Sequence, residues 1–150
     1  MKLRLPAIAR DERGTSLIEF AFLAPFLAFL TMGVIDLSRG LAERFALQQA
    51  VNRSLELVQA RPAVAGAEST DVDYSFVAAE AASAADVKPE QVTLTRWLEC
   101  DGNVMPKVTD TCSGDEDVAR YLRVRIEKDF KGDFYFETIP MAASGALRTQ

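Results

Sequence analysis

The sequence predicts an α+β protein, made of a long N-terminal helix, one additional helix and a small antiparallel β-sheet. Three observations predict this fold class. No charged residue occurs from Phe20 to Ile35, and an amphipathic helical pattern then continues to about Ala60. Residues 121–128 alternate apolar and polar side chains, as in a strand with one buried face. The chain has 150 residues, which leaves room for one modest domain beside the helix.

The apolar segment has the length of a membrane-spanning helix. With Leu17 and Ile18 included, it would extend roughly 28 Å, close to the ~30 Å hydrocarbon core of a bilayer. It is longer than the apolar region of a secretory signal peptide, and no A-x-A-like cleavage site follows it. Basic residues are in excess before the segment and not after it, which predicts a cytoplasmic N-terminus and an exported C-terminal part.

Two residues depart from a simple membrane anchor. Glu19 places a carboxylate at the cytoplasmic end of the segment, where the insertion cost is lower than the ~2.5–3.5 kcal/mol expected at the bilayer centre. It is either a favourable helix-start carboxylate or a functional group. Pro25 cannot donate a backbone hydrogen bond to the Ala21 carbonyl, which predicts a kink or a point of flexibility.

One helix is predicted from about residue 15 to residue 60, provided that Gly40 does not break it. The helix should end before Arg61-Pro62, because a residue that precedes proline disfavours helical geometry. Asp36 and Arg39 stand three residues apart and could pair on one helix face. The predicted apolar face outside the membrane segment consists of Leu37, Leu41, Phe45, Leu47, Val51, Leu55 and Val58.

A second helix is predicted over residues 71–85, after a linker at residues 61–70. Thr70 and Asp73 resemble a capping box, with Asp in place of the preferred Glu. The predicted packing face of this helix consists of Tyr74, Val77, Ala78, Ala81 and Ala85.

Strands are predicted from β-branched and aromatic content and from alternation. They lie at residues 91–98, near Val104, at residues 121–128 and at residues 134–139. The last ten residues form either an edge strand or a frayed end. Arg123 and Arg125 fall on the polar face of the third strand, which is either a solvated face or a docking patch for an acidic partner subunit.

Cys100 and Cys112 predict a disulfide, because the domain is expected to be exported. Closing this loop is worth about 3 kcal/mol on a chain-entropy model. Free thiols and a metal site are the alternatives. The acidic loop from Asp110 to Asp117 lacks the spacing of a calcium loop, so a solvated loop is expected, with calcium or partner contact as the alternative.

The composition argues against an enzyme and against nucleic-acid binding. The net charge is −5, and no basic stripe suits a phosphate backbone. The chain has no histidine, which removes the commonest general base and metal ligand. Nothing resembles a phosphate-binding loop, a nucleophile elbow or a dinucleotide fingerprint. We expect no cofactor, no metal and no small-molecule substrate.

The start of the chain resembles a known processing signal. A basic leader ends at Gly14, Glu19 follows at the fifth position after it, and a long apolar segment comes next. This arrangement resembles the class III signal of type IV pilins and pseudopilins, which prepilin peptidase cleaves after the glycine. Over residues 13–39 the chain is similar to TadE-like proteins, the minor pseudopilins of the tight adherence (Flp) pilus system. The matching residues are Arg13, Gly14, Glu19, Phe20, Ala21, Pro25, Asp36 and Arg39, with Asp36 where the family more often has Glu.

The resemblance implies a pilin-like fold and cleavage between Gly14 and Thr15. Glu19 and Phe20 would then serve recognition and assembly, with the Glu19 carboxylate meeting the N-terminal amine of a neighbouring subunit. Four ranges follow: a cytoplasmic leader at 1–14, a transmembrane helix at 15–37, an amphipathic helix at 38–60 and a periplasmic α+β head at 61–150. Removing the leader takes away four basic and two acidic residues, so 17 − 4 = 13 basic and 22 − 2 = 20 acidic residues remain, a net charge of −7.

The implied function is that of a minor pseudopilin, which supports assembly or initiation of a tight adherence pilus. The expected partners are prepilin peptidase and other pilin or pseudopilin subunits, including a second TadE-like or TadF-like protein. The expected location is the bacterial inner membrane, crossed once. Two alternatives remain at this point: a minor pseudopilin of a type II secretion system, and an unprocessed, signal-anchored periplasmic domain that binds or senses a ligand.

Overall fold

The computed structural model describes residues 13–61 and 72–149, and the side chains from residue 17 onward. The predicted leader up to residue 12, the linker at 62–71 and Thr70 of the predicted capping box lie outside these ranges. The described elements confirm the predicted α+β class. They are α1 (Arg13–Gln59), α2 (Ser75–Ala85), the 3₁₀ helix η2 (Pro89–Gln91), β1 (Val92–Cys100), β2 (Asn103–Val104), β3 (Val118–Phe130) and β4 (Ile139–Arg148).

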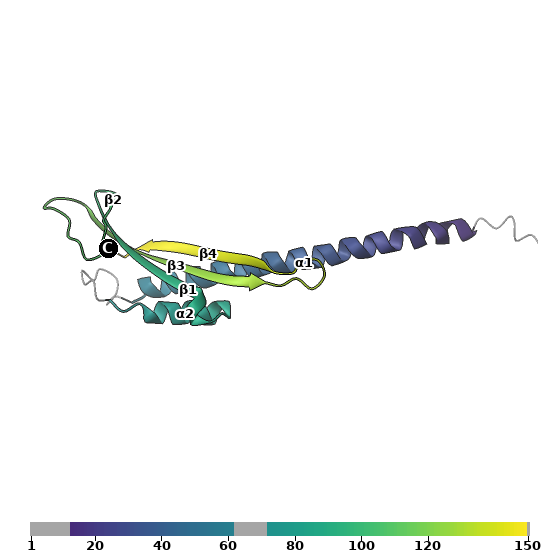
Figure 1. The fold of residues 1–150 in the computed structure, drawn as a ribbon, viewed down its shortest axis with the longest axis horizontal. Coiled ribbons are helices and arrows are strands. Elements are labelled where there is room, and N and C mark those ends of the chain that lie inside the picture. The colour runs from purple at the N-terminus through teal and green to yellow at the C-terminus, as the bar shows by residue number, and fades with distance from the viewer. Residues whose placement is uncertain (1–12, 62–71, 150) are drawn as a thin grey trace, which may run out of the picture.

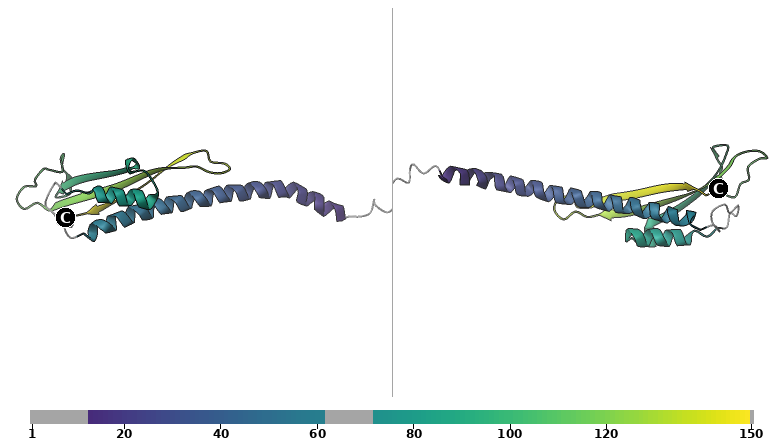
Figure 2. Two further views of the ribbon diagram at one scale, coloured as in Figure 1. Left: turned by 90° about the horizontal axis from the view of Figure 1, so that it is seen from below. Right: turned by 180° about the vertical axis from the view of Figure 1, so that it is seen from behind.

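The four strands form one antiparallel sheet in the order β2-β1-β3-β4. Both helices cover the same face of this sheet, and the strands run along α1 (Figure 1). Figure 2 shows that the N-terminal half of α1 extends well past the sheet. The molecule therefore consists of a projecting helix and a head, by which we mean α2, the sheet and their loops.

The core lies between the two helices and the sheet. In β3, Leu122, Val124 and Ile126 are buried, as the alternating pattern predicted. From α1 the buried apolar residues are Leu47, Ala50, Val51 and Val58, and from α2 they are Val77, Ala81, Ala82 and Ala85. The predicted packing face of α2 is thus confirmed at Val77, Ala81 and Ala85, whereas Tyr74 and Ala78 are only half-buried.

The predicted apolar face of α1 is wrong in its first half. Leu47, Val51 and Val58 are buried, but Leu37, Leu41 and Phe45 are exposed. The stripe that faces the head instead contains small and polar side chains at helical spacing, namely Asp36, Gly40, Glu43, Leu47, Ala50, Val51, Ser54 and Val58. A pattern of hydrophobic residues could not predict this stripe, because its N-terminal residues contact the head through hydrogen bonds and small side chains.

The last predicted strand, at residues 134–139, was placed too early. Residues 131–138 form the connection between β3 and β4, and the strand runs from Ile139 to Arg148, in the region expected to be an edge strand or a frayed end. Small side chains there let α1 approach closely. Ala143 is buried, and a Cβ on Gly145 would lie 2.9 Å from Val51 Cγ1 and 3.0 Å from Leu55 Cδ1.

Helix α2 begins at Ser75, later than predicted, and Asp73 binds its first residue. The Asp73 carboxylate accepts the Ser75 backbone N–H at 2.8 Å and the Ser75 hydroxyl at 2.9 Å. The backbone N–H and then the hydroxyl of Ser75 lower the pKa of Asp73 below its ordinary value. The aspartate therefore caps the first turn from two residues before the helix.

Lys128 joins three elements on the helix-covered side of the sheet. Its Nζ lies 2.5 Å from Glu43 Oε1 of α1 and donates a 3.0 Å hydrogen bond to the Ala85 carbonyl at the end of α2. The lysine thus neutralises a half-buried carboxylate and supplies a donor to a helix C-terminus.

Candidate assembly site on the N-terminal helix

The projecting half of α1 is the candidate membrane span. Among the described residues, this one helix is long and apolar enough to cross a membrane, and its apolar stretch is not buried against the head. Glu19 and Phe20 are both exposed on it, as residues that contact lipid or another subunit would be. Gly14 and Thr15, the predicted cleavage pair, lie in the first turn of the helix. The predicted cleavage pair and the head are therefore at opposite ends of the molecule.

Pro25 lies inside α1 without ending it. The left view of Figure 2 shows that the helix bends in its N-terminal part, which contains this proline. The predicted kink is thus consistent with the course of the helix. Gly40 does not interrupt α1 either, and a Cβ there would lie 3.5 Å from Phe130 Cε1, which is an ordinary van der Waals contact.

Asp36 is the junction between the projecting helix and the head. Its side chain is completely buried, with 0% of its surface exposed. Oδ1 accepts the backbone N–H of Asp133 at 3.0 Å, and Oδ2 accepts those of Phe134 at 3.0 Å and Tyr135 at 2.7 Å. One carboxylate therefore binds three consecutive backbone donors of the β3–β4 connection. Hydrogen bonds to a charged acceptor are stronger than neutral ones, so this contact fixes the loop against α1.

The surroundings of Asp36 are tightly packed. A Cβ on Gly132 would lie 2.8 Å from the Phe136 carbonyl oxygen and 2.9 Å from Asp36 Oδ2, so only glycine fits there without a shift. Arg39 forms an ion pair with Asp133. The predicted pairing of Asp36 with Arg39 is therefore wrong: the carboxylate is taken by backbone donors, and the guanidinium pairs with the same loop one residue after Gly132.

Tyr135 extends the contact from Asp36 toward the apolar segment. Its backbone N–H is bound by Asp36, and its hydroxyl donates a 3.3 Å hydrogen bond to the carbonyl of Phe29. A Cβ on Gly33 would lie 3.9 Å from Tyr135 Cε2. The tyrosine side chain thus runs along α1, from the end of the apolar segment toward its interior.

An exposed apolar stripe continues on α1 past the membrane segment. We call it the outer stripe; its members are Val34, Leu37, Leu41 and Phe45, all exposed and all at helical spacing. An apolar hollow of about 150 Å³ lies beside it, lined in part by Leu37, Leu41, Phe136 and Ile139. A stripe of this kind next to a hollow is typical of a surface that packs against another protein.

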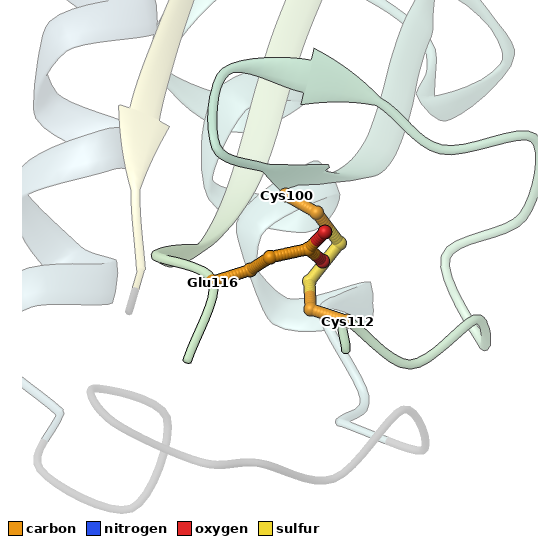
Figure 3. Close-up of side chains that lie close together, drawn as sticks. All are labelled: Cys100, Cys112 and Glu116. Carbon is orange, nitrogen blue, oxygen red and sulfur yellow. A yellow bond between two sulfur atoms is a disulfide. The ribbon is translucent and has the colours of Figure 1, made fainter. Parts of the chain in front are cut away.

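The predicted disulfide between Cys100 and Cys112 is present (Figure 3). Glu116 lies beside it, and the three side chains are close enough for a metal site, but both sulfurs are already bonded to each other. Glu116 also accepts the Ser113 backbone N–H at 2.8 Å, and Asp110 accepts that of Lys107 at 3.0 Å. These carboxylates therefore order their own loop, which gives each of them a structural role.

Breaking this disulfide is expected to lower the free energy of unfolding of the head by about 3 kcal/mol, because the open loop gains entropy in the unfolded chain. Thermal unfolding of the full chain in detergent, with and without dithiothreitol, measures this. The double variant Cys100→Ser with Cys112→Ser is the matched control and should not respond to the reductant. An unchanged midpoint in the wild type, with reduction verified by mass, would contradict the expectation.

The face of the sheet away from the helices carries the predicted arginine pair. Trp97 and Tyr121 stack there with ring centroids 5.0 Å apart, and the Arg123 guanidinium lies 4.9 Å above the Trp97 ring. Arg125 pairs with Glu127 at 2.8 Å. The two arginines thus have partners within the chain, and a docking role for them remains a prediction.

Comparison with known proteins places a family signature on this same helix. Residues 14–54 match the family model described as TadE-like protein. No curated protein and no solved structure gives a match. The TadE-like match confirms the predicted resemblance, and it begins at Gly14 and covers most of α1, including Asp36 and the outer stripe. A TadE-like segment indicates a protein associated with the tight adherence pilus.

Proposed function

We propose that the protein is a minor pseudopilin, which supports assembly or initiation of a tight adherence pilus after cleavage by prepilin peptidase between Gly14 and Thr15. The observation that carries the proposal is the TadE-like match, which begins at Gly14 and follows α1 into the head. The proposed division is a leader at 1–14, a transmembrane helix at 15–37, its amphipathic continuation at 38–60 and a head exposed on the far side of the inner membrane.

The shape of the helix supports this role. Its projecting half is free to lie in a bilayer or against neighbouring helices, and Glu19 is exposed there. Cleavage would create an ammonium group at Thr15, about one helical turn from Glu19. In a low-dielectric environment a carboxylate and an amine from two subunits attract strongly, whereas an unpaired carboxylate is costly. Such a pair would fix the register between subunits.

The outer stripe offers a second contact surface. It continues the apolar surface of the helix beyond the membrane segment and stops where Gln48 and Asn52 follow on the same side. A partner helix could therefore pack along α1 from the bilayer to about Phe45. The proposed partners are other pilin or pseudopilin subunits. The function is non-enzymatic, and every step uses packing and charge pairing.

The N-terminal residue tests the proposal. Protein isolated from cells that contain prepilin peptidase should begin at Thr15, and protein from cells without the peptidase should retain the leader. Mass spectrometry of the intact chain measures both. Gly14→Leu should block processing, and Ala9→Leu, which introduces the same side chain elsewhere in the leader, should not. A wild-type chain that keeps its leader in the presence of an active peptidase would overturn the proposal.

A further inference from the structure

The connection between β3 and β4 contains three consecutive exposed aromatic residues. Phe134 is 53% exposed, Tyr135 50% and Phe136 38%. We call these three residues the aromatic tip. Exposed apolar rings that lie side by side usually mark a surface that binds something apolar. The question is which surface lies within reach of the tip.

The position of the tip is fixed relative to the apolar segment of α1. Asp36 holds the backbone of Phe134 and Tyr135, and the Tyr135 hydroxyl reaches the Phe29 carbonyl. Phe29 lies seven residues before Asp36, which is about 10 Å along a helix. The tip therefore lies beside the last part of the apolar segment, which runs from Phe20 to Ile35. If that segment lies in a bilayer, the tip cannot stay in water.

The depth and the chemistry both match the interfacial layer of a membrane. Side chains that bind at an interface insert about 5–10 Å into the boundary between headgroups and acyl chains. Tyrosine, with its hydroxyl satisfied, is enriched in that layer, and phenylalanine is among the residues that interfacial segments bury in it. Charged residues flank the tip in the sequence on both sides: Lys131 and Asp133 precede it, and Glu137 follows it. Lys131 and Glu137 are exposed, and Asp133 pairs with Arg39 of α1. Such charged neighbours suit the polar headgroup layer next to inserted rings.

We propose that the aromatic tip inserts into the interfacial layer of the bilayer, so that the head is seated on the membrane by two elements, α1 and the β3–β4 connection. The partner is the lipid bilayer itself. The burial of Asp36 is consistent with this position at the membrane. Its carboxylate accepts backbone N–H groups, so Asp36 exposes no charge at that depth. The proposal shares with the proposed function the requirement that α1 spans a membrane, and it is independent of cleavage and of pilus assembly.

Tryptophan fluorescence in nanodiscs tests the proposal. The full chain would be placed, one copy per disc, in phosphatidylethanolamine and phosphatidylglycerol, with part of the lipid carrying a nitroxide on the upper acyl chain. Trp97→Phe removes the single native tryptophan and keeps a ring beside Tyr121. Phe134→Trp then reports on the tip. Phe26→Trp reports on the apolar segment, and Val104→Trp, in exposed β2, reports on the head away from the membrane.

The expected result is a blue-shifted Phe134→Trp emission that the nitroxide lipid quenches about as strongly as it quenches Phe26→Trp, with little quenching by aqueous iodide. Val104→Trp should show the reverse. Quenching of Phe134→Trp by iodide to the level of Val104→Trp would overturn the proposal. So would protection from both quenchers, since that indicates a protein contact. A Phe26→Trp signal that the lipid does not quench would remove the membrane span itself, and with it both this proposal and the membrane part of the proposed function.

Discussion

Replacing Asp36 with alanine is expected to lower the free energy of unfolding of the head by on the order of 3 kcal/mol. Three backbone donors lose a charged acceptor, and each such hydrogen bond contributes about 1.5–3 kcal/mol. The full sum is not expected, because the freed loop can turn its N–H groups toward water. Urea or thermal unfolding of the full chain in detergent measures the loss, and amide hydrogen exchange at residues 133–135 locates it.

Two variants serve as controls for Asp36→Ala. Asp36→Asn keeps the shape and one acceptor oxygen, so its loss should be smaller. Asp133→Asn removes only the exposed ion pair with Arg39, which is worth less than about 1 kcal/mol. Equal stability of Asp36→Ala and Asp133→Asn, with no faster exchange at residues 133–135, would show that the carboxylate does not hold the loop.

Replacing Glu19 with alanine is expected to reduce assembly at least about tenfold while leaving the fold of the head unchanged. The reason is the proposed pairing of this carboxylate with the amine of a neighbouring subunit, since close charge pairs at interfaces couple by about 1.5–7 kcal/mol. Glu19 is exposed near the start of α1, whereas α1 contributes to the core only from Leu47 onward, so unfolding of the head should not change. Counting surface pili in a peptidase-positive cell measures assembly.

Glu56→Ala is the matched control for Glu19→Ala, because Glu56 is exposed on the same helix but outside the projecting half. It should assemble normally. The N-terminus of the Glu19→Ala protein must also be determined, because a chain that still begins with its leader would report a processing defect. Normal pili from correctly processed Glu19→Ala protein would contradict the proposed pairing.

The elements with a strong internal period could be predicted from the sequence. Leu122, Val124 and Ile126 alternate without interruption, and β3 buries them as expected. The apolar run before Ile35 requires a helix in any environment that excludes water, because a helix satisfies its own backbone groups. The two cysteines, taken with an exported domain, were sufficient to predict the disulfide.

The contact between α1 and the head could not be predicted in the same way. Its stripe begins with Asp36, Gly40 and Glu43, so a search for hydrophobic spacing selects the exposed Leu37, Leu41 and Phe45 instead. In β4, Gly145 and Ala143 matter because their small size lets α1 pack closely against the strand, and size alone gives no periodic signal in the sequence. One signal was present in the sequence: Asp36 lies at helical spacing from Leu47, Val51 and Val58. Its partners are backbone groups 97 to 99 residues away, which no local pattern reveals.

The alignment of α1 with the strands also has a mechanical consequence. The buried face of the helix runs from Asp36 to Val58, about 33 Å along its axis, and the strands lie along it (Figure 1). A pull on the N-terminal end of α1 would load these contacts in shear, so that they resist together and do not open one after another. The contacts of the β3–β4 connection, at Phe29 and at Asp36, would meet the force first. A helix drawn out of a membrane during assembly would therefore bring its folded head along as one unit.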